Sequence, residues 1–226
     1  MKTSSRSTHV IISGSLLLIL LFTWIGSMIL SPFEGSSQDQ LQQVFTNWRT
    51  YQFSFVIALF IAPAYVYFMI SLLKMNQAEI DIHKAAGLTI AVFYIICATI
   101  AYGAQLTLVP YYLNHGQPFM AQHWFFFDNH SISYYINHTG YALWAMSALF
   151  LFTGMVGKKG VTRVIGVLFV LSAALSLAAY AGLIFKIPVL NLMTVPSGML
   201  TIPISLFSVM LAAKKTTGEK EEQIIG

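Results

Sequence analysis

The sequence predicts an all-α fold, a polytopic membrane bundle of six transmembrane helices. Three observations support this prediction: an apolar composition, six long apolar runs, and positive charges that gather on one side of those runs. Of the 226 residues, 57% are hydrophobic and only 9% are charged, whereas soluble globular domains carry about 25% charged residues. A chain so poor in charge cannot cover a water-facing surface, so lipid is its expected solvent.

The apolar runs set the number and the boundaries of the expected helices. Each run can cross about 30 Å of hydrocarbon at about 1.5 Å per residue, and helix is expected because an open strand would leave backbone groups unpaired in lipid. The first run exceeds the core of about 7–15 residues found in signal peptides, so we expect an uncleaved span. The expected spans cover residues 10–30, 51–73, 85–109, 132–156, 161–185 and 189–213. With their loops they form one domain over residues 1–213, followed by a charged cytoplasmic tail over residues 214–226.

Positive charges predict the orientation of these spans. All but two of the twelve lysines and arginines fall on one side, which the positive-inside rule assigns to the cytoplasm. They are Lys2, Arg6, Lys74, Lys84, Lys158, Lys159, Arg163, Lys214, Lys215 and Lys220. Only Arg49 and Lys186 fall on the other side. We therefore expect a multi-pass protein of the cell membrane with both the N and the C terminus in the cytoplasm.

The basic balance of the chain does not indicate a nucleic-acid partner. The net charge is +4 and the pI is near 9.1, but the basic residues are scattered between apolar runs rather than gathered on one face. The lipid bilayer is the expected partner instead. Cys97 is the only cysteine, so an intrachain disulfide is excluded.

The segment over residues 31–50 is expected outside the membrane, partly as a helix. Ser37 is a plausible N-cap with Asp39 in the first turn, and Leu41 and Val44 begin an apolar set at helical spacing. This pattern predicts an amphipathic helix that leads into the second span. A solvated loop is the alternative.

The outer segment over residues 110–131 has no lysine or arginine and many aromatic side chains. It contains Tyr111, Tyr112, His115, His123, Trp124, Phe125, Phe126, Phe127, Asp128 and His130. Aromatic rings prefer the membrane interface, so the segment either lies there or folds back over the helices as a lid.

Prolines mark the last span as irregular. Pro196 and Pro203 lie inside it and Pro188 lies just before it. Proline kinks a helix and frees carbonyl groups, and in transporters broken helices line binding sites. Proline is also common in membrane helices of every function, so both interpretations stay open.

Polar residues near the outer ends of the spans form the candidate ligand pocket. Polar groups at this depth cost free energy unless they are satisfied, so they tend to face the protein interior. The candidates are Tyr102, Gln105, His123, Asp128, Tyr135, His138, Trp144 and Asn191. In the alternative interpretation, tyrosine and tryptophan anchor helix ends, while Gln105 and His138 form interhelical hydrogen bonds.

Whether the outer histidines bind a metal is left open by the sequence. Histidine and carboxylate side chains suit zinc or iron, but their spacing matches no compact motif. The candidate ligands are His115, His123, Asp128, His130 and His138. No nucleophile motif, P-loop or dinucleotide fingerprint is present. We therefore expect no cofactor, and the sequence favours a protein that is not an enzyme without deciding the question.

Two stretches carry a resemblance to a known group of proteins. They are AYGAQLTLVP over residues 101–110 and HSISYYINHTGYALWAMSALF over residues 130–150, and the shared residues are Tyr102, Gly103, Gln105, Ser131, Tyr135, Gly140 and Tyr141. Together they resemble a family of uncharacterised bacterial multi-pass membrane proteins, mainly in the C-terminal half. The resemblance implies a bacterial membrane and supplies no activity and no catalytic residues.

These patterns support one functional hypothesis and two alternatives. An aromatic segment above a polar floor favours the binding or transport of a small amphipathic molecule from the outer face. A membrane-embedded, metal-dependent enzyme that uses the outer histidine segment is the first alternative. An accessory subunit of a membrane complex is the second.

Overall fold

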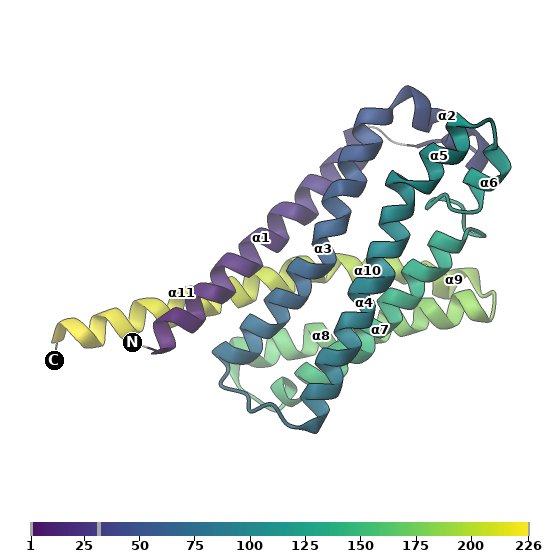
Figure 1. The fold of residues 1–226 in the computed structure, drawn as a ribbon. Helices are drawn as coiled ribbons and strands as arrows, with labels where there is room; N and C mark the ends of the chain where they lie inside the picture. Colours follow the sequence, from purple (N-terminus) through teal and green to yellow (C-terminus); the bar gives the residue numbers. More distant parts are fainter. Residues whose placement is uncertain (1, 31–32, 226) are drawn as a thin grey trace. The chain divides into compact units, whose positions relative to one another are not determined.

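The computed structural model describes residues 2–30 and 33–225, and it describes side chains for residues 5–30 and 33–217. Every regular element in this part of the chain is an α-helix (Figure 1). The helices are α1 (Lys2–Leu30), α2 (Ser37–Thr46), α3 (Trp48–Met75), α4 (Ile82–Leu106), α5 (Leu108–Asn114), α6 (Pro118–Gln122), α7 (Ile132–Val156), α8 (Gly160–Ile184), α9 (Pro188–Asn191), α10 (Thr194–Met199) and α11 (Thr201–Ile225).

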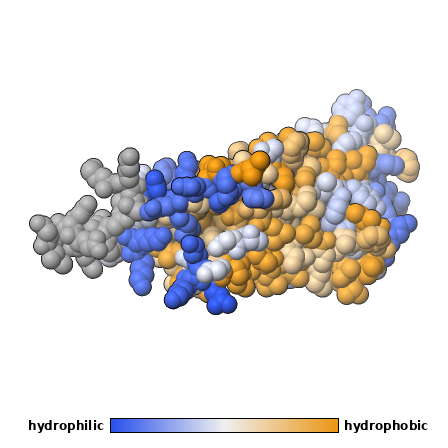
Figure 2. Space-filling view, turned by 90° about the horizontal axis from the view of Figure 1, so that it is seen from below, coloured by the Kyte–Doolittle hydropathy of each residue, from blue (hydrophilic) through white to orange (hydrophobic). Residues whose placement is uncertain are grey.

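Among the described residues, six helical segments are long and apolar enough to cross a membrane, which agrees with the all-α fold and the six spans expected. They are Ser5–Leu30, Trp48–Met75, Ile82–Asn114, Ile132–Val156, Gly160–Ile184 and Pro188–Thr217. Many large apolar side chains on these helices are exposed on the surface of the protein (Figure 2). Water would penalise such a surface, whereas hydrocarbon does not, so lipid is the solvent that this fold requires.

The observed ends of the helices agree with the expected spans to different degrees. The fourth span begins and ends where the sequence predicts, at residues 132 and 156. In the third, α4 ends at Leu106 and the short helix α5 extends the segment to Asn114, beyond the expected end at residue 109. The last helix continues as α11 to Ile225, well past the expected end of the span at residue 213.

The amphipathic helix expected before the second span is present as α2, but its N-cap lies one residue earlier than predicted. Ser36, not Ser37, is the N-cap. The Ser36 hydroxyl accepts from the Asp39 N–H, and the Asp39 carboxylate accepts from the Ser36 N–H at 2.9 Å. This reciprocal capping box satisfies two N–H groups at once. The hydrogen bond from the Ser36 hydroxyl, and then that from its N–H, lowers the pKa of Asp39 below its usual value.

The last span is divided into three helices, and each begins with a proline in its first turn. Pro188 is the first residue of α9, Pro196 the third of α10 and Pro203 the third of α11. The first turn tolerates proline because its N–H groups have no partner within the helix. The prolines therefore start new helices rather than kink a continuous one.

The chain divides into two compact units. Unit 1 comprises Met1–Leu18, Ala64–Val92 and Tyr141–Gly226, and unit 2 comprises Ile19–Pro63 and Phe93–Gly140. The prediction of one domain over residues 1–213 stays a prediction.

Unit 1 is held together by close helix packing and by a small set of serines. The rings of Phe152 and Phe169 stack with their centroids 4.0 Å apart. Between α8 and α10, the Ser172 hydroxyl donates to the Ser197 carbonyl at 2.8 Å, and the Ser197 hydroxyl donates to the Ser172 carbonyl at 2.9 Å. A Cβ atom at Gly182 would lie 2.5 Å from the Asn191 backbone nitrogen, so only glycine permits the close approach of α8 and α9.

Unit 2 has an aromatic core. Tyr51 and Phe55 on α3 are fully buried, and Phe125 from the segment after α6 is fully buried beside them. The rings of Tyr51 and Phe55 lie 4.8 Å apart, and those of Tyr51 and Phe125 lie 6.5 Å apart. The segment over residues 110–131 therefore folds back over the helices of its own unit, one of the two arrangements that the sequence left open.

Candidate functional site

Gln105, near the end of α4, is a predicted pocket residue with several hydrogen bonds inside the protein. Its side chain is fully buried. The amide oxygen accepts from the Tyr51 hydroxyl at 2.8 Å and from the Phe126 N–H at 2.9 Å. The amide nitrogen lies 2.8 Å from the carbonyl oxygens of Ala101 and Trp124 and 3.0 Å from the Ser133 hydroxyl. Both lone pairs and both N–H groups are thus used within the protein.

Asp128 is also used to fold the segment in which it lies. It is buried, and its carboxylate accepts from the Gln122 side-chain amide at 2.7 Å and from the His130 N–H at 2.8 Å. Nearby, the Ile132 N–H donates to the His123 carbonyl at 2.7 Å. These bonds close the segment on itself just before α7 begins. We call residues 123–131 the aromatic cap.

Aromatic rings attach this cap to α3 and α4. Phe126 packs against Phe55 and Tyr102, with ring centroids 5.5 Å apart in both pairs. Phe127 packs against Phe33 at 5.3 Å. Tyr102, another predicted pocket residue, is therefore buried in the contact between α4 and the cap. Gln105 and Tyr102 both contact Phe126 of the cap, and their grouping in a ligand pocket stays a prediction.

The remaining predicted residues of unit 2 differ in exposure. His138 is buried, and its Nδ1 lies 3.0 Å from the Tyr134 carbonyl oxygen, so Nδ1 carries the proton. His123 is exposed, and its Nδ1 lies 2.8 Å from the Phe119 carbonyl oxygen. Tyr135 is also exposed. The exposed pair therefore faces away from the buried set around Gln105.

Trp144 and Asn191 belong to unit 1. Trp144 is buried, and its ring lies 5.5 Å from that of Tyr65 on α3 in an edge-on arrangement. Asn191 ends α9, and its carbonyl accepts from the Thr194 hydroxyl at 3.0 Å. Both of these contacts lie within unit 1.

The histidines raised as metal ligands are not gathered into a ligand set in the described structure. Among the described residues, no group of three or more histidine, cysteine, aspartate or glutamate side chains is placed to hold a metal ion. His115 instead makes a hydrogen bond along its own helix, where its Nδ1 lies 2.8 Å from the Tyr111 carbonyl oxygen.

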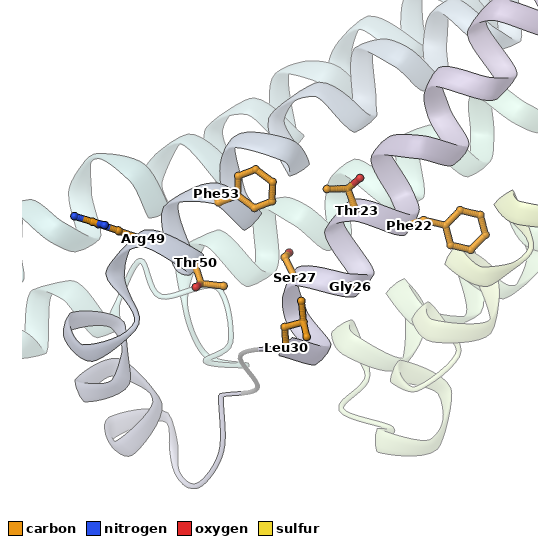
Figure 3. Close-up of a pocket in the computed structure, with 8 residues that line it drawn as sticks. All are labelled: Phe22, Thr23, Gly26, Ser27, Leu30, Arg49, Thr50 and Phe53. Atoms are coloured by element: carbon orange, nitrogen blue, oxygen red, sulfur yellow. The ribbon is translucent and has the colours of Figure 1, made fainter.

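A different feature of unit 2 is an open groove on its surface. A groove of about 640 Å³ lies between the C-terminal part of α1 and the N-terminal part of α3 (Figure 3). Ligand pockets in proteins commonly have volumes of about 300–1,000 Å³. The groove is lined by Phe22, Thr23, Gly26, Ser27, Leu30, Arg49, Thr50 and Phe53.

The walls of the groove are apolar, and its polar groups are the hydroxyls of α1 and α3 and the guanidinium of Arg49. Phe22, Leu30 and Phe53 are at least half exposed, so no described part of the protein covers them. The Thr23 and Ser27 hydroxyls donate to carbonyl groups of α1, at 2.7 Å each. The Ser27 hydroxyl also accepts from the Ser54 hydroxyl at 2.8 Å, so it is already engaged as donor and as acceptor, whereas the Thr23 hydroxyl keeps its lone pairs for a further hydrogen bond.

Gly26 leaves space in the groove, and Arg49 adds a positive charge to its lining. A Cβ atom added at Gly26 would have no atom within 4 Å, so the space beside this lining residue is open. Arg49 is exposed at the rim, and its guanidinium extends away from α1 (Figure 3). Within the described part of the chain, no hydrogen bond or ion pair engages this guanidinium, and the salt bridge found there joins Lys84 to Asp81 instead.

Sequence reasoning did not identify this groove. It treated residues 10–30 as a plain span and searched for polar side chains in the other outer segments. A signal was nevertheless present, because Arg49 is one of only two cations expected outside and stands at the start of a span. Thr23, Gly26 and Ser27 also recur at helical spacing near the end of the first span.

Comparison with known proteins assigns no family, since no protein-family model, no curated protein and no solved structure matches the chain. The class of the protein therefore rests on its fold and its composition. Six long apolar helices in a chain with 9% charged residues define an integral multi-pass membrane protein.

Proposed function

We propose that this protein binds a small amphipathic molecule from the outer face of a bacterial cell membrane, in the groove between α1 and α3. The observation that carries the proposal is the groove itself, with apolar walls, free space at Gly26 and a cation at its rim. An amphipathic molecule matches both parts, since its chain suits the phenylalanines and its polar end suits the rim.

Polar groups must provide most of the selectivity of such a site. Lipid tails are as apolar as leucine, so a chain that moves from the bilayer into the groove gains little from the hydrophobic effect. Shape and hydrogen bonding are therefore the remaining sources of selectivity. Thr23, Ser27 and Thr50 place hydroxyl groups along the groove, and Arg49 places a positive charge at its rim.

The predicted topology would place this rim on the outer side of the membrane. With the N terminus in the cytoplasm, α1 ends outside and α3 begins outside. The bacterial membrane is proposed from the family resemblance alone. Reporter fusions test the orientation: a fluorescent protein fused after residue 226 is expected to fluoresce, and alkaline phosphatase fused within residues 31–36 is expected to be active. An inactive phosphatase there would contradict the orientation.

A filled groove tests the binding proposal. Gly26→Phe is expected to place a ring in the free space, because a Cβ atom there meets nothing within 4 Å. Gly154→Phe is the matched control, since Gly154 on α7 also has no neighbour within 4 Å of an added Cβ atom. A diazirine-labelled single-chain phospholipid is photolysed with each protein, and the labelled peptides are mapped by mass spectrometry.

The two variants should differ in the labelling of the groove. In the wild type and in Gly154→Phe, we expect label on the peptides that contain Phe22 and Phe53. In Gly26→Phe, we expect that label to fall about tenfold, by loss of a well-fitted chain. Equal labelling of the groove in Gly26→Phe and in the wild type would contradict the proposal.

A further inference from the structure

We infer that the occupant of the groove is an anionic phospholipid of the surrounding bilayer, with its acyl chain between α1 and α3 and its headgroup on Arg49. The inference rests on the proposed function and specifies the ligand class. It depends on the state of Arg49, on the position of Arg49 relative to the apolar walls, and on the access of the groove to lipid.

Arg49 is a cation without an anion in the described structure. It is exposed, and no described carboxylate lies within ion-pair distance of it. The Asp39 carboxylate, in the first turn of α2, is hydrogen-bonded instead to the Ser36 hydroxyl at 2.6 Å and to the Ser36 N–H at 2.9 Å. Arginine binds phosphate through two parallel N–H groups, which makes a phosphodiester the complementary partner.

The position of Arg49 suits a lipid headgroup. It is the second residue of α3, beside Trp48, at the end of a membrane-spanning helix. Tryptophan at such an end prefers the level of the lipid headgroups, and a long arginine side chain near a helix end extends toward it. Phe53, one turn further into the helix, begins the apolar wall of the groove. A lipid with its phosphate at Arg49 would therefore extend its chain along Phe53 and across to Phe22.

The groove is open in the direction from which a lipid would enter. Its large apolar side chains are exposed by 51% at Phe53, 55% at Phe22 and 84% at Leu30. A soluble ligand would have to displace bilayer lipid from these side chains, whereas a bilayer lipid is already in contact with them. The guanidinium points away from α1 (Figure 3). Because it is exposed and unpaired in the described structure, it can change rotamer toward a bound phosphate at small cost.

The charge of the headgroup decides the selectivity. Zwitterionic lipids also contain a phosphate, but their ammonium group offsets the attraction to Arg49. One basic residue near the surface favours an anionic lipid by about fivefold. The inference therefore predicts a preference of this size for phosphatidylglycerol over phosphatidylcholine.

Native mass spectrometry of the purified full chain tests this preference. The protein is incorporated into nanodiscs that contain equal amounts of phosphatidylglycerol and phosphatidylcholine, and the lipids that remain bound after release are identified. The wild type is expected to retain phosphatidylglycerol over phosphatidylcholine by about fivefold. Arg49→Gln should lose the preference, Arg49→Lys should keep part of it, and Lys186→Gln, which removes the other cation expected outside, should keep all of it.

The outcomes distinguish the headgroup inference from the groove itself. If Gly26→Phe removes the retained lipid while Arg49→Gln keeps the wild-type preference, lipid binding in the groove stands and the role of Arg49 is overturned. If the wild type shows no preference, the anionic class is overturned. If Gly26→Phe retains as much lipid as the wild type, the groove is not the site and the proposed function fails as well.

Discussion

The aromatic cap and the α1–α3 groove belong to the same unit, yet they use their polar groups in opposite ways. Around the cap, the Gln105 amide is satisfied by the protein, and Phe125 is fully buried against Tyr51. In the groove, Arg49 has no partner in the described structure and Gly26 faces free space. The first region resembles a finished core, and the second resembles a site that awaits a ligand.

The difference shows what separates a polar group used by the fold from one left free for a ligand near the end of a span. A buried amide in lipid has a large cost if it is left unpaired, so the fold provides partners for it. A ligand site must keep groups unsatisfied, and only groups at an exposed rim can remain so at low cost. Arg49 meets this condition and Gln105 does not.

The largest expected effect comes from removal of the centre of the cap. Phe125→Ala should destabilise the protein by about 3–5 kcal/mol, because the side chain is fully buried and its loss leaves a cavity. Phe119→Ala is the control, since Phe119 precedes the cap and is 69% exposed. Thermal unfolding in detergent measures both. Equal melting temperatures for the two variants would show that the cap is not a core.

The hydrogen-bond network of Gln105 should have the next largest effect. Gln105→Leu leaves the Tyr51 hydroxyl, the Phe126 N–H and the Trp124 carbonyl without their partner. We expect a loss of about 2–4 kcal/mol in the free energy of unfolding. Ser133→Ala removes a single contact of the network, and about 1 kcal/mol is expected from it.

A readout of local structure identifies where the Gln105 substitution acts. Limited proteolysis should cut Gln105→Leu within residues 117–131 faster than it cuts the wild type, because the cap loses its attachment to α4. Labelling of the groove by the diazirine lipid should not change. If Gln105→Leu abolished that labelling while the protein stayed folded, the separation of cap and groove would be wrong.

The smallest expected effect concerns the capping box of α2. Ser36→Ala should destabilise this helix by about 1 kcal/mol. The pKa of Asp39 is lowered in the folded protein, so its contribution is present above its ordinary pKa of 3.8 and is lost as the pH falls through the lowered value. Hydrogen exchange of the α2 amides, corrected for intrinsic rates, should show this loss below about pH 4. If the protection of the α2 amides did not change with pH, or if it were the same in Asp39→Asn as in the wild type, this role of Asp39 would be excluded.

Much of the fold could be predicted because lipid imposes a simple rule on the chain. A run of about 20 apolar residues in a membrane must be a helix, and the apolar run over residues 132–156 coincides with α7. Where other forces act, prediction was less accurate. The capping serine was misplaced by one residue, since Ser36 and Ser37 both match the pattern and only the backbone geometry decides between them.

The candidate site was harder to predict, because pairing within the fold is not visible in a sequence. Gln105 and Asp128 were identified as polar residues in an apolar setting, but the sequence does not reveal that Trp124, Phe126 and Gln122 satisfy them. The groove depends on a shape left between two helices whose contact no motif encodes. Its one charged residue, Arg49, was noted only as an exception to the charge rule.

A photocrosslinking comparison on α3 tests the central claim most directly. Benzoylphenylalanine replaces Phe53 in the groove, Phe60 on the same helix outside it, or Phe125 in the cap; Phe53 and Phe60 are 51% and 59% exposed. In membranes of mixed phosphatidylglycerol and phosphatidylcholine, position 53 should form adducts enriched in the anionic lipid by about fivefold. Position 60 should report the bulk composition, and position 125 should crosslink only within the protein. The same lipid composition at positions 53 and 60 would contradict a selective groove.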